Sequence, residues 1–331
     1  MPMRTPDFWS SKAGPGGRFI ACALSPLSGA FSIAGCARQC LTRPWQAGVP
    51  VICVGNLTAG GTGKTPVAIA LAEHLTGLGG HPHFLTRGYG GTVTGPLQVE
   101  PARHTASEVG DEALLLAAAA PTWVARDRHT GANAAIAAGA DSLILDDGFQ
   151  DGRLIKDISL IVIDGAAGFG NGRLIPAGPL RETVAEGLTR AQAAVIVGTD
   201  TVGVRQTLTA LRPDLPIFTA HLQPAPEAAV LNGTRVLGFA GIGRPEKFAE
   251  TLNALGCELS DFIGFADHHP YSETDQKKLR ERAETLGAQL VTTAKDAVRL
   301  SAEMRNTVKV VEVSAAFDDP AALKELISPN R

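Results

Sequence analysis

Short apolar runs alternate with segments of helical periodicity along most of the chain after residue 48. The segment 64–79, for example, places Leu71, Leu75 and Leu78 on one helical face. Apolar runs predict strands near 49–54, 83–86, 121–124, 143–146, 158–163, 194–197 and 215–219, and the segments between them predict helices at 64–79, 111–120 and 127–139. Apolar strands that alternate with helices are typical of a parallel sheet covered by helices.

A second alternating set begins after the proline-punctuated segment 221–227. It predicts strands at 235–240, 258–263, 289–293 and 308–313 and helices at 245–256 and 273–287. We therefore place a domain boundary near residue 225, where the composition changes. The chain is expected to hold an N-terminal segment at 1–45, a larger α/β domain at 46–225, and a smaller α/β domain at 226–331 that closes a cleft.

The loop after the first predicted strand carries the strongest chemical signal, because it ends in Gly63-Lys64-Thr65 at the start of a helix. In such a loop the backbone N–H groups approach a phosphate, the lysine reaches the terminal phosphates and the threonine can ligate Mg²⁺. The strict pattern needs glycine at position 58, where this chain has threonine. An ordinary glycine-rich turn is the alternative. We predict a nucleotide-binding P-loop formed by Thr58, Ala59, Gly60, Gly61, Thr62, Gly63, Lys64 and Thr65.

Two adjacent acids, Asp146 and Asp147, end an apolar strand downstream of the P-loop. An acid in that position is where P-loop enzymes hold Mg²⁺, directly or through water. The alternative is a surface turn, since Asp-Asp-Gly is common there. Together with the P-loop, the pair predicts a metal site built from Thr65 and one or both aspartates, with ATP and Mg²⁺ as cofactors.

Two further acidic segments are candidates for proton transfer. Asp111 and Glu112 open an alanine-rich helix, where they could complement the helix dipole or accept a proton from an attacking hydroxyl. Asp267 and His268 precede a helix of the second domain, where the histidine could lie in a solvated loop or tune a carboxylate across the cleft. Sequence alone does not bring Asp111 and His268 together.

Other candidates have weaker signals. Tyr89 lies in the turn 87–90 after a strand and could approach a ligand, although the turn itself explains the residues. Glu182 ends the proline-rich loop 175–182, whose role does not follow from its composition. Five cysteines without a C-x-x-C spacing indicate a reduced compartment. The net charge of −3 argues against a nucleic-acid partner.

The N-terminal segment differs from the rest in charge and hydropathy. Residues 1–43 carry five basic side chains and one acidic side chain, and the stretch 19–37 is uncharged. Trp9 and Trp45 flank the stretch and could anchor at headgroup depth, whereas Pro26 interrupts it. A helix on a membrane surface, a membrane-spanning helix and a helix packed on the protein body are all compatible with this pattern. We expect a membrane-associating helix.

In combination, these segments resemble the tetraacyldisaccharide 4′-kinase family of Gram-negative lipid A biosynthesis. The likeness covers roughly residues 45–300, and the departure at Thr58 is shared with the family. The motifs that carry it, in family order, are 54–57 with 60–66, 87–90, 109–112, 146–150, 176–182, 240–245, 267–269 and 292–298. The resemblance implies a P-loop kinase-type parallel sheet domain with a second, smaller α/β domain.

The resemblance also implies an activity and its residues. It implies ATP–Mg²⁺-dependent phosphorylation of the 4′-hydroxyl of a tetraacyl glucosamine disaccharide 1-phosphate, which gives the bisphosphorylated precursor lipid IVA. Asp111 would be the base and His268 its partner, while Lys64 would steady the phosphates. Glu112 and Glu182 look like further active-site members. The substrate is a glycolipid, so the implied location is the cytoplasmic face of the bacterial inner membrane.

Two other classes share a P-loop. A GTPase that works through binding partners usually selects guanine with an Asn-Lys-x-Asp loop, and this chain contains no Asn-Lys pair. An ATP-dependent ligase would act on a soluble acceptor. Neither alternative accounts for the N-terminal segment or for Asp267-His268.

Overall fold

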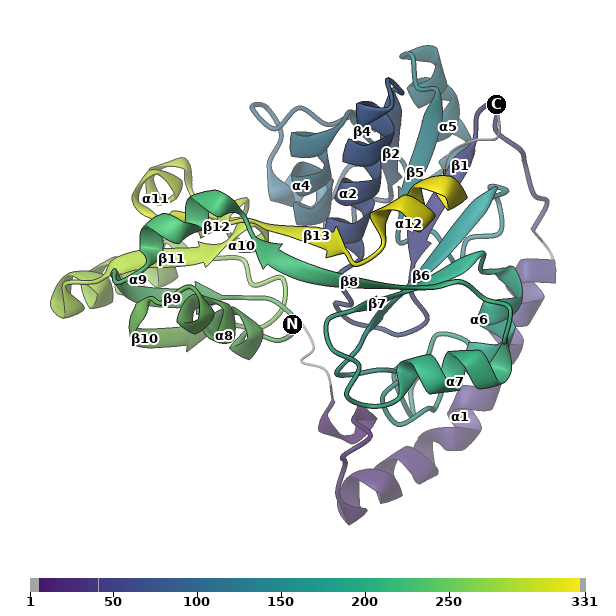
Figure 1. The fold of residues 1–331 in the computed structure, drawn as a ribbon, viewed down its shortest axis with the longest axis horizontal. Helices are drawn as coiled ribbons and strands as arrows, with labels where there is room; N and C mark the ends of the chain where they lie inside the picture. The colour runs from purple at the N-terminus through teal and green to yellow at the C-terminus, as the bar shows by residue number, and fades with distance from the viewer. Residues whose placement is uncertain (1–5, 41, 328–331) are drawn as a thin grey trace.

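The computed structural model describes residues 6–40 and 42–327 and contains two sheets, one nine-stranded and one four-stranded. Figure 1 shows the two sheets in separate lobes, with β8 (Ile217–Pro224) and β13 (Val313–Phe317) running between them. The predicted class, a larger parallel α/β domain with a smaller α/β domain and an N-terminal helix, is confirmed by this architecture.

The large sheet has the first predicted strand at its centre. Its strands, in spatial order, are β13 (Val313–Phe317), β8 (Ile217–Pro224), β7 (Ala193–Val197), β6 (Ile158–Asp164), β1 (Val51–Gly55), β5 (Ser142–Asp146), β2 (Pro82–Thr86), β4 (Thr122–Val124) and β3 (Leu97–Gln98). All neighbouring pairs from β8 to β4 are parallel, and only the edge strands β13 and β3 pair antiparallel. The carboxyl ends of the central strands therefore meet at one edge, where a P-loop fold binds its ligand.

Helices cover both faces of the large sheet, because its central strands are apolar on both sides. Those of this lobe are α2 (Lys64–Gly77), α3 (Ala106–Val109), α4 (Asp111–Ala119), α5 (Arg128–Ala137), α6 (Val184–Arg190), α7 (Val204–Leu211) and α12 (Pro320–Ile327). One core cluster unites α2, α4 and α12 with one face of the sheet, through Leu71, Leu116 and Leu323. The other cluster unites α5, α6 and α7 with the opposite face.

The small lobe is a second parallel sheet with cores of its own. Its strands, in spatial order, are β10 (Glu258–Gly264), β9 (Arg235–Ala240), β11 (Gln289–Thr293) and β12 (Lys309–Val311). The helical segments are η2 (Pro226–Leu231), α8 (Glu246–Ala254), α9 (Glu273–Leu286), α10 (Ala294–Ala297) and α11 (Ala302–Thr307). The helix α9 begins with a capping box, in which Ser272 and Asp275 satisfy each other's backbone N–H groups.

The structure corrects the predicted extent of the second domain, 226–331, at its C-terminal end. The chain returns to the large lobe at β13, which pairs antiparallel with β8 from Val313 opposite Pro224 to Phe317 opposite Ala220. Helix α12 then packs into the core of the large lobe through Leu323 and Ile327. The strand expected at 308–313 is in fact two strands that belong to different sheets. Local pattern could not show this, because the pairing joins residues far apart in the chain.

The two lobes also meet through an ion-pair cluster. Asp164, at the end of β6, accepts hydrogen bonds from Arg244 and from Lys247 of the small lobe. Burial raises the pKa of Asp164, but the two cations and a backbone N–H outweigh that effect, so its pKa lies below the ordinary value. This carboxylate therefore stays ionised at neutral pH and holds the start of α8 against the large lobe.

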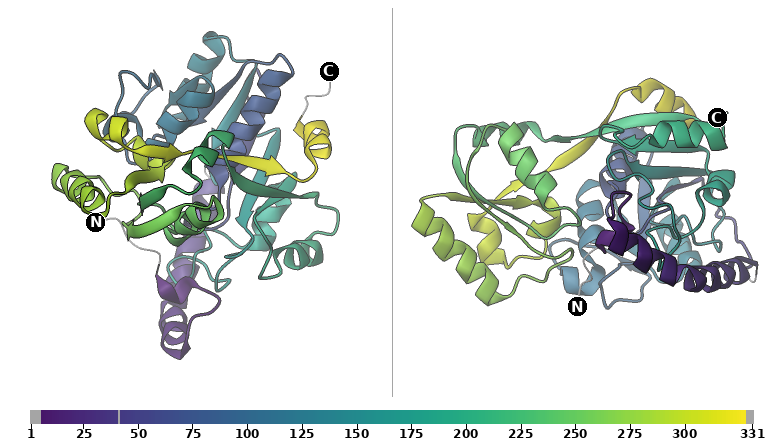
Figure 2. Two further views of the ribbon diagram at one scale, coloured as in Figure 1. Left: turned by 60° about the vertical axis from the view of Figure 1, so that its left-hand side comes forward. Right: turned by 90° about the horizontal axis from the view of Figure 1, so that it is seen from below.

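The N-terminal helix α1 (Pro15–Cys40) follows the short helix η1 (Asp7–Trp9) and lies along one side of the large lobe (Figure 2). Its inward face is small and polar. The Ser28 hydroxyl donates to the Leu174 carbonyl over 2.8 Å, and the Arg173 guanidinium donates to the Ser25 hydroxyl over 2.5 Å. Phe19, Ile20, Leu27 and Ile33 of this helix are exposed, whereas Leu24 and the partly exposed Phe31 line the cavity described below. Within residues 6–40 and 42–327, no helix has the length and hydropathy that crossing a bilayer requires.

Leu71→Ala tests the core that holds α2 on the sheet. Leu71 is 0% exposed, so truncation should lower the free energy of unfolding by about 2–5 kcal/mol. The matched control is Leu78→Ala at the end of the same helix, where 55% exposure predicts a change within about 0.5 kcal/mol. Urea unfolding followed by tryptophan fluorescence reports on the large lobe, because Trp9, Trp45 and Trp123 all precede the small lobe. Equal midpoints for the two variants would contradict this packing.

Candidate active site

The P-loop connects β1 to α2 and contains the positive backbone angles that such a loop needs. Gly60 has φ of 118° and Gly63 has φ of 88°, and Gly63 caps α2 in the left-handed conformation. Thr58 is not among the residues of positive φ. It is held instead by a bridge to Leu180, and the neighbouring Ala59 N–H donates to the Pro179 carbonyl over 2.8 Å. Threonine is tolerated at this position because the turn does not demand glycine there.

A buried asparagine braces the loop from within. The Asn56 amide donates to the Gly60 carbonyl over 3.4 Å and to the Thr62 hydroxyl over 3.3 Å. Lys64 opens α2, and its ammonium lies 4.0 Å from an Asp147 carboxylate oxygen. The loop thus presents Gly60, Gly61 and Lys64 to the cavity described below, while Thr58 and Thr62 are buried and support it.

The two adjacent aspartates have different surroundings. Asp147 has a positive φ of 54°, and its carboxylate forms a two-bond ion pair with Arg181 at 2.8 and 3.2 Å. Burial raises its pKa, but Lys64 and Arg181 outweigh that effect and hold the pKa below its ordinary value. Asp147 is therefore ionised and already paired with two cations.

Asp146 lacks such partners. Burial raises its pKa to about 7, and the negative charges of Glu112 and Asp147 act in the same direction. One carboxylate oxygen accepts from the Thr65 hydroxyl over 3.1 Å. The other is buried and has no hydrogen-bond partner in the described part of the chain. An orphaned, destabilised carboxylate oxygen beside the P-loop threonine fits a cation, because a cation would satisfy it and favour its ionised form.

Mg²⁺ rarely has an all-protein cage and is usually held by one or two carboxylates together with phosphates. Among the side chains that the structure describes, no group of three or more His, Cys, Asp or Glu could hold a metal by itself. The pair of Thr65 and Asp146 has the composition that this mode of binding requires. The donor set is hard oxygen, which suits Mg²⁺ rather than a softer metal.

Asp111 and His268, which sequence reasoning could not bring together, are in direct contact. The histidine Nδ1 lies 2.8 Å from the Asp111 Oδ2, across 157 positions of sequence. Gly110 makes this approach possible, because it has φ of 89° and a Cβ there would lie 2.5 Å from the Tyr89 carbonyl oxygen. His268 itself has φ of 56°, and its N–H donates to Asp267 over 3.1 Å.

The surroundings of Asp111 keep it ionised. Burial raises its pKa, but the hydrogen bond to His268 and the charges of Lys295 and Arg299 outweigh burial, so the pKa lies below its ordinary value. Asp111 does not line the cavity, whereas His268 does. The pair therefore offers the cavity an imidazole backed by a carboxylate.

Two cations near this pair, Lys295 and Arg299, were not predicted as site residues. Arg299 Nε lies 3.5 Å from the Asp111 carboxylate, and Lys295 Nζ lies 3.6 Å from Glu112 and 3.6 Å from Asp267. The only sequence signal was the family motif at 292–298, which includes Lys295 and carried no assigned role. Their proximity depends on the packing of α10 against α4, which local pattern does not encode.

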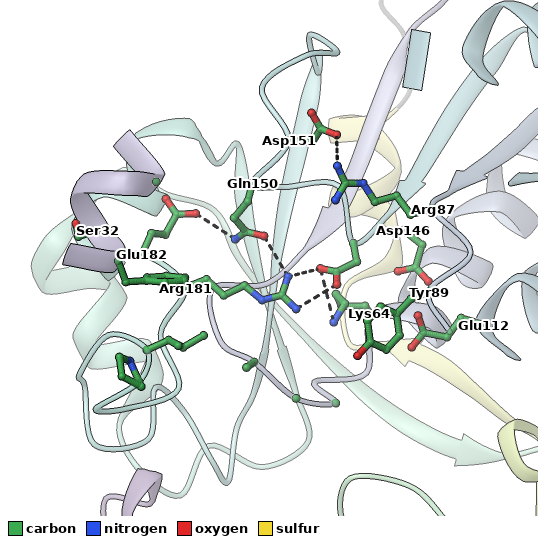
Figure 3. Close-up of a pocket in the computed structure, with 18 of the residues that line it drawn as sticks. Ser32, Lys64, Arg87, Tyr89, Glu112, Asp146, Gln150, Asp151, Arg181 and Glu182 are labelled. Carbon is green, nitrogen blue, oxygen red and sulfur yellow. Dashed lines mark hydrogen bonds and ion pairs between the residues drawn. The ribbon is translucent and has the colours of Figure 1, made fainter. Parts of the chain in front are cut away.

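The weaker candidates also reach the site. Tyr89 is 73% exposed, and its ring lies edge-on to His268 with centroids 5.7 Å apart. Glu182 lies on another wall, where it accepts from Gln150 over 3.1 Å and pairs with Arg190 at 2.5 Å. Figure 3 shows Glu112 and Tyr89 near Lys64 and Asp146, with Arg181 and Glu182 farther along the pocket.

One cavity of about 1400 Å³ joins these groups. It extends from the P-loop and His268 past Arg87, Arg128 and Arg153 to the inner side of α1 at Leu24 and Ser32. Arg128 is fully buried and donates to the Leu85 carbonyl over 2.7 Å, and burial lowers its pKa to about 10. The predicted site residues that line it are Ala59, Gly60, Gly61, Lys64, Tyr89, Glu112, Asp146, Asp147, Glu182, Asp267 and His268. Such a cavity has room for a nucleotide and for a polar acceptor beside it.

Comparison with known proteins identifies the family. The family model described as tetraacyldisaccharide-1-P 4′-kinase matches residues 20–330. A tetraacyldisaccharide 4′-kinase from Rhodospirillum centenum is 53% identical over 328 residues, which cover 99% of this chain and 96% of that protein. A protein of the same name from Rhodospirillum rubrum is 48% identical and covers 98% of this chain and 97% of its own length.

A solved structure agrees with the fold. The crystal structure titled "apo" form LpxK from Aquifex aeolicus in complex with ATP superposes with a TM-score of 0.73 and 27% sequence identity. The match covers 93% of this chain and 98% of that chain. Because the family model spans nearly the whole sequence and the relatives align almost end to end, this chain belongs to the tetraacyldisaccharide 4′-kinase family.

Proposed function

We propose that this protein transfers the γ-phosphate of ATP to the 4′-hydroxyl of a tetraacyl glucosamine disaccharide 1-phosphate, which gives lipid IVA. The observation that carries the proposal is the single cavity in which the P-loop faces His268 and its partner Asp111. A phosphate cradle on one wall and an acid–base pair on another is the arrangement that a hydroxyl kinase needs. Nothing in the cavity or in the comparisons favours the GTPase or the ligase.

The chain's own residues supply alignment, charge and a proton acceptor. Lys64 and the loop N–H groups hold the donor phosphates at the start of α2. The acceptor oxygen attacks the γ-phosphorus, the bond to the β–γ bridging oxygen breaks, and ADP leaves with that electron pair. The hydroxyl proton passes to the Asp111–His268 pair, whose carboxylate is kept ionised by the cations around it. Asp267 lies 3.9 Å from the imidazole Nε2 of His268 and Tyr89 lies edge-on to its ring, so both limit its orientation.

Mg²⁺ is assigned to Thr65 and Asp146. The support is the orphaned carboxylate oxygen of Asp146 and its hydrogen bond to Thr65. Asp147 is occupied by Lys64 and Arg181, so we assign it to holding those cations rather than to direct metal contact. When bound, the ion neutralises charge that develops on the phosphates during transfer.

The N-terminal helix is assigned to the membrane surface, on the cytoplasmic face of the inner membrane where ATP is available. The support is the packing of this helix. Ser25 and Ser28 form hydrogen bonds with the protein body, whereas Phe19, Ile20, Leu27 and Ile33 are exposed, with the exposed Arg18 beside them. Burial of such side chains at a headgroup boundary is favourable, and a basic residue adds attraction to anionic lipids. Leu24, Phe31 and Ser32 of this helix line the cavity, so a helix lying on the bilayer would bring the cavity close to a lipid headgroup.

Product formation tests the function directly. Purified protein with [γ-³²P]ATP, Mg²⁺ and the disaccharide 1-phosphate lipid in detergent should give a labelled bisphosphorylated lipid. Omission of the lipid or addition of EDTA should abolish the product. GTP hydrolysis without labelled lipid would reject the proposal in favour of a GTPase.

Asp111→Ala tests the acid–base pair. Loss of the proton acceptor should lower kcat by about 10²–10⁴-fold while ATP binding, measured by calorimetry, stays unchanged. The matched control is Asp319→Ala, because Asp319 is also an acid that accepts a backbone N–H in the first turn of a helix but lies outside the cavity. A kcat for Asp111→Ala equal to that of Asp319→Ala would reduce Asp111 to a helix cap.

Replacing the outward face of α1 tests membrane association. Phe19→Ser with Ile33→Ser removes two side chains that are 76% and 72% exposed, so stability should change little while co-sedimentation with anionic vesicles falls several-fold. The control is Val230→Ser with Val313→Ser, two exposed apolar positions elsewhere on the surface. Unchanged sedimentation of the α1 variant would mean that another surface binds the membrane.

A further inference from the structure

Lys295 is the one side chain of the small lobe's helix α10 that lines the cavity. Its ammonium lies 3.3 Å from His268 Nε2, and it approaches Glu112 and Asp267 at 3.6 Å each. Lys295 therefore brings a positive charge from the second domain into contact with the acid–base pair.

The backbone that carries Lys295 is held firmly by a buried carboxylate. Asp296 is 0% exposed and accepts from the Tyr271 hydroxyl over 2.6 Å, from the Gly241 N–H over 2.8 Å and from the Thr293 hydroxyl over 2.6 Å. Thr293 in turn caps α10 by accepting the Asp296 N–H. Fixed in this way, the helix aims the Lys295 side chain into the cavity rather than into solvent.

Arg299, about one helical turn after Lys295, has more partners than Lys295 and is less exposed. It is 6% exposed, and its guanidinium is shared among Asp111, Asp296 and the carbonyls of Gly241 and His269. No N–H group of Arg299 faces the cavity, so it acts on substrate only by holding Asp111. Lys295 is 22% exposed, and its carboxylate contacts at 3.6 Å are longer than good hydrogen bonds.

The position of Lys295 relative to the donor phosphates follows from its neighbour Glu112. Glu112 lines the cavity at its P-loop end, as Lys64 and Asp146 do, and Figure 3 shows it beside them. Lys295, whose ammonium lies 3.6 Å from Glu112, is therefore placed beside this end of the cavity.

We propose that Lys295 is a catalytic residue that exchanges its carboxylate partners for the transferring phosphoryl group and stabilises it from the small lobe. The inference rests on the proposed function and deepens it. As the acceptor oxygen bonds to the γ-phosphorus and the bridging oxygen leaves with ADP, negative charge spreads over the equatorial oxygens. Lys64 meets that charge from the P-loop side and Lys295 from the side of the acceptor.

Lys295→Met tests the proposal with little change in side-chain volume. Removing one preorganised donor should lower kcat by about 10²–10³-fold, while the Kd for ATP changes by less than about threefold. Lys295→Arg, which restores the positive charge, should recover part of the loss. The matched control is Lys277→Met, an exposed lysine of α9 in the same lobe, with unchanged kcat. A kcat for Lys295→Met within about threefold of the wild type would overturn the proposal.

A second measurement separates contact with the phosphoryl group from a purely structural role. Aluminium fluoride with ADP and Mg²⁺ mimics the transferring group, and calorimetry gives the gain in ADP affinity on adding it. That gain should fall at least tenfold in Lys295→Met and persist in Lys277→Met. An equal gain in the wild type and Lys295→Met would mean that Lys295 only supports its neighbours. These titrations need no lipid, so a wild type that forms no lipid product counts against the proposed function alone.

Discussion

The hydrogen bond between Asp111 and His268 is the contact on which the candidate site depends, because it joins the two lobes beside the cavity that the P-loop lines. Asp111 begins α4 in the large lobe, and His268 lies in a loop of the small lobe. Gly110 supplies the positive backbone angle before Asp111 without steric cost, whereas the left-handed angle of His268 is unfavourable for a residue with a Cβ and is held by the surrounding fold. A second ion-pair cluster, at Asp164, holds the lobes together away from this contact.

Two neighbouring aspartates of the cavity differ in their pKa because the groups around them differ. Asp146 and Asp147 are neighbours, yet one is shifted toward the protonated form and the other toward the ionised form. The difference arises because Asp147 meets Arg181 and Lys64, whereas Asp146 has one hydroxyl partner and one free oxygen. Arg299 and Lys295 also differ in their surroundings. The guanidinium of Arg299 is bonded to several protein groups, whereas Lys295 lines the cavity.

Much of this could be foreseen from the chain. The succession of strands along the chain from β1 to β11, apart from the short β3, follows from local periodicity, and the P-loop and the acidic strand end follow from short motifs. The C-terminal return to the large sheet could not be foreseen, since β13 is short and its partner β8 lies about ninety residues earlier. The roles of Lys295 and Arg299 were missed for the same reason.

The sequence by itself determined the nucleotide cradle, the alternation of strands and helices, and the unusual N-terminal segment. Tertiary structure decided which acid meets the histidine, which aspartate keeps a free oxygen, and which face of α1 is exposed. The reason is physical. A loop that binds phosphate is a local property of consecutive backbone groups, whereas the ionisation and reach of a side chain depend on neighbours that only folding brings within a few ångströms.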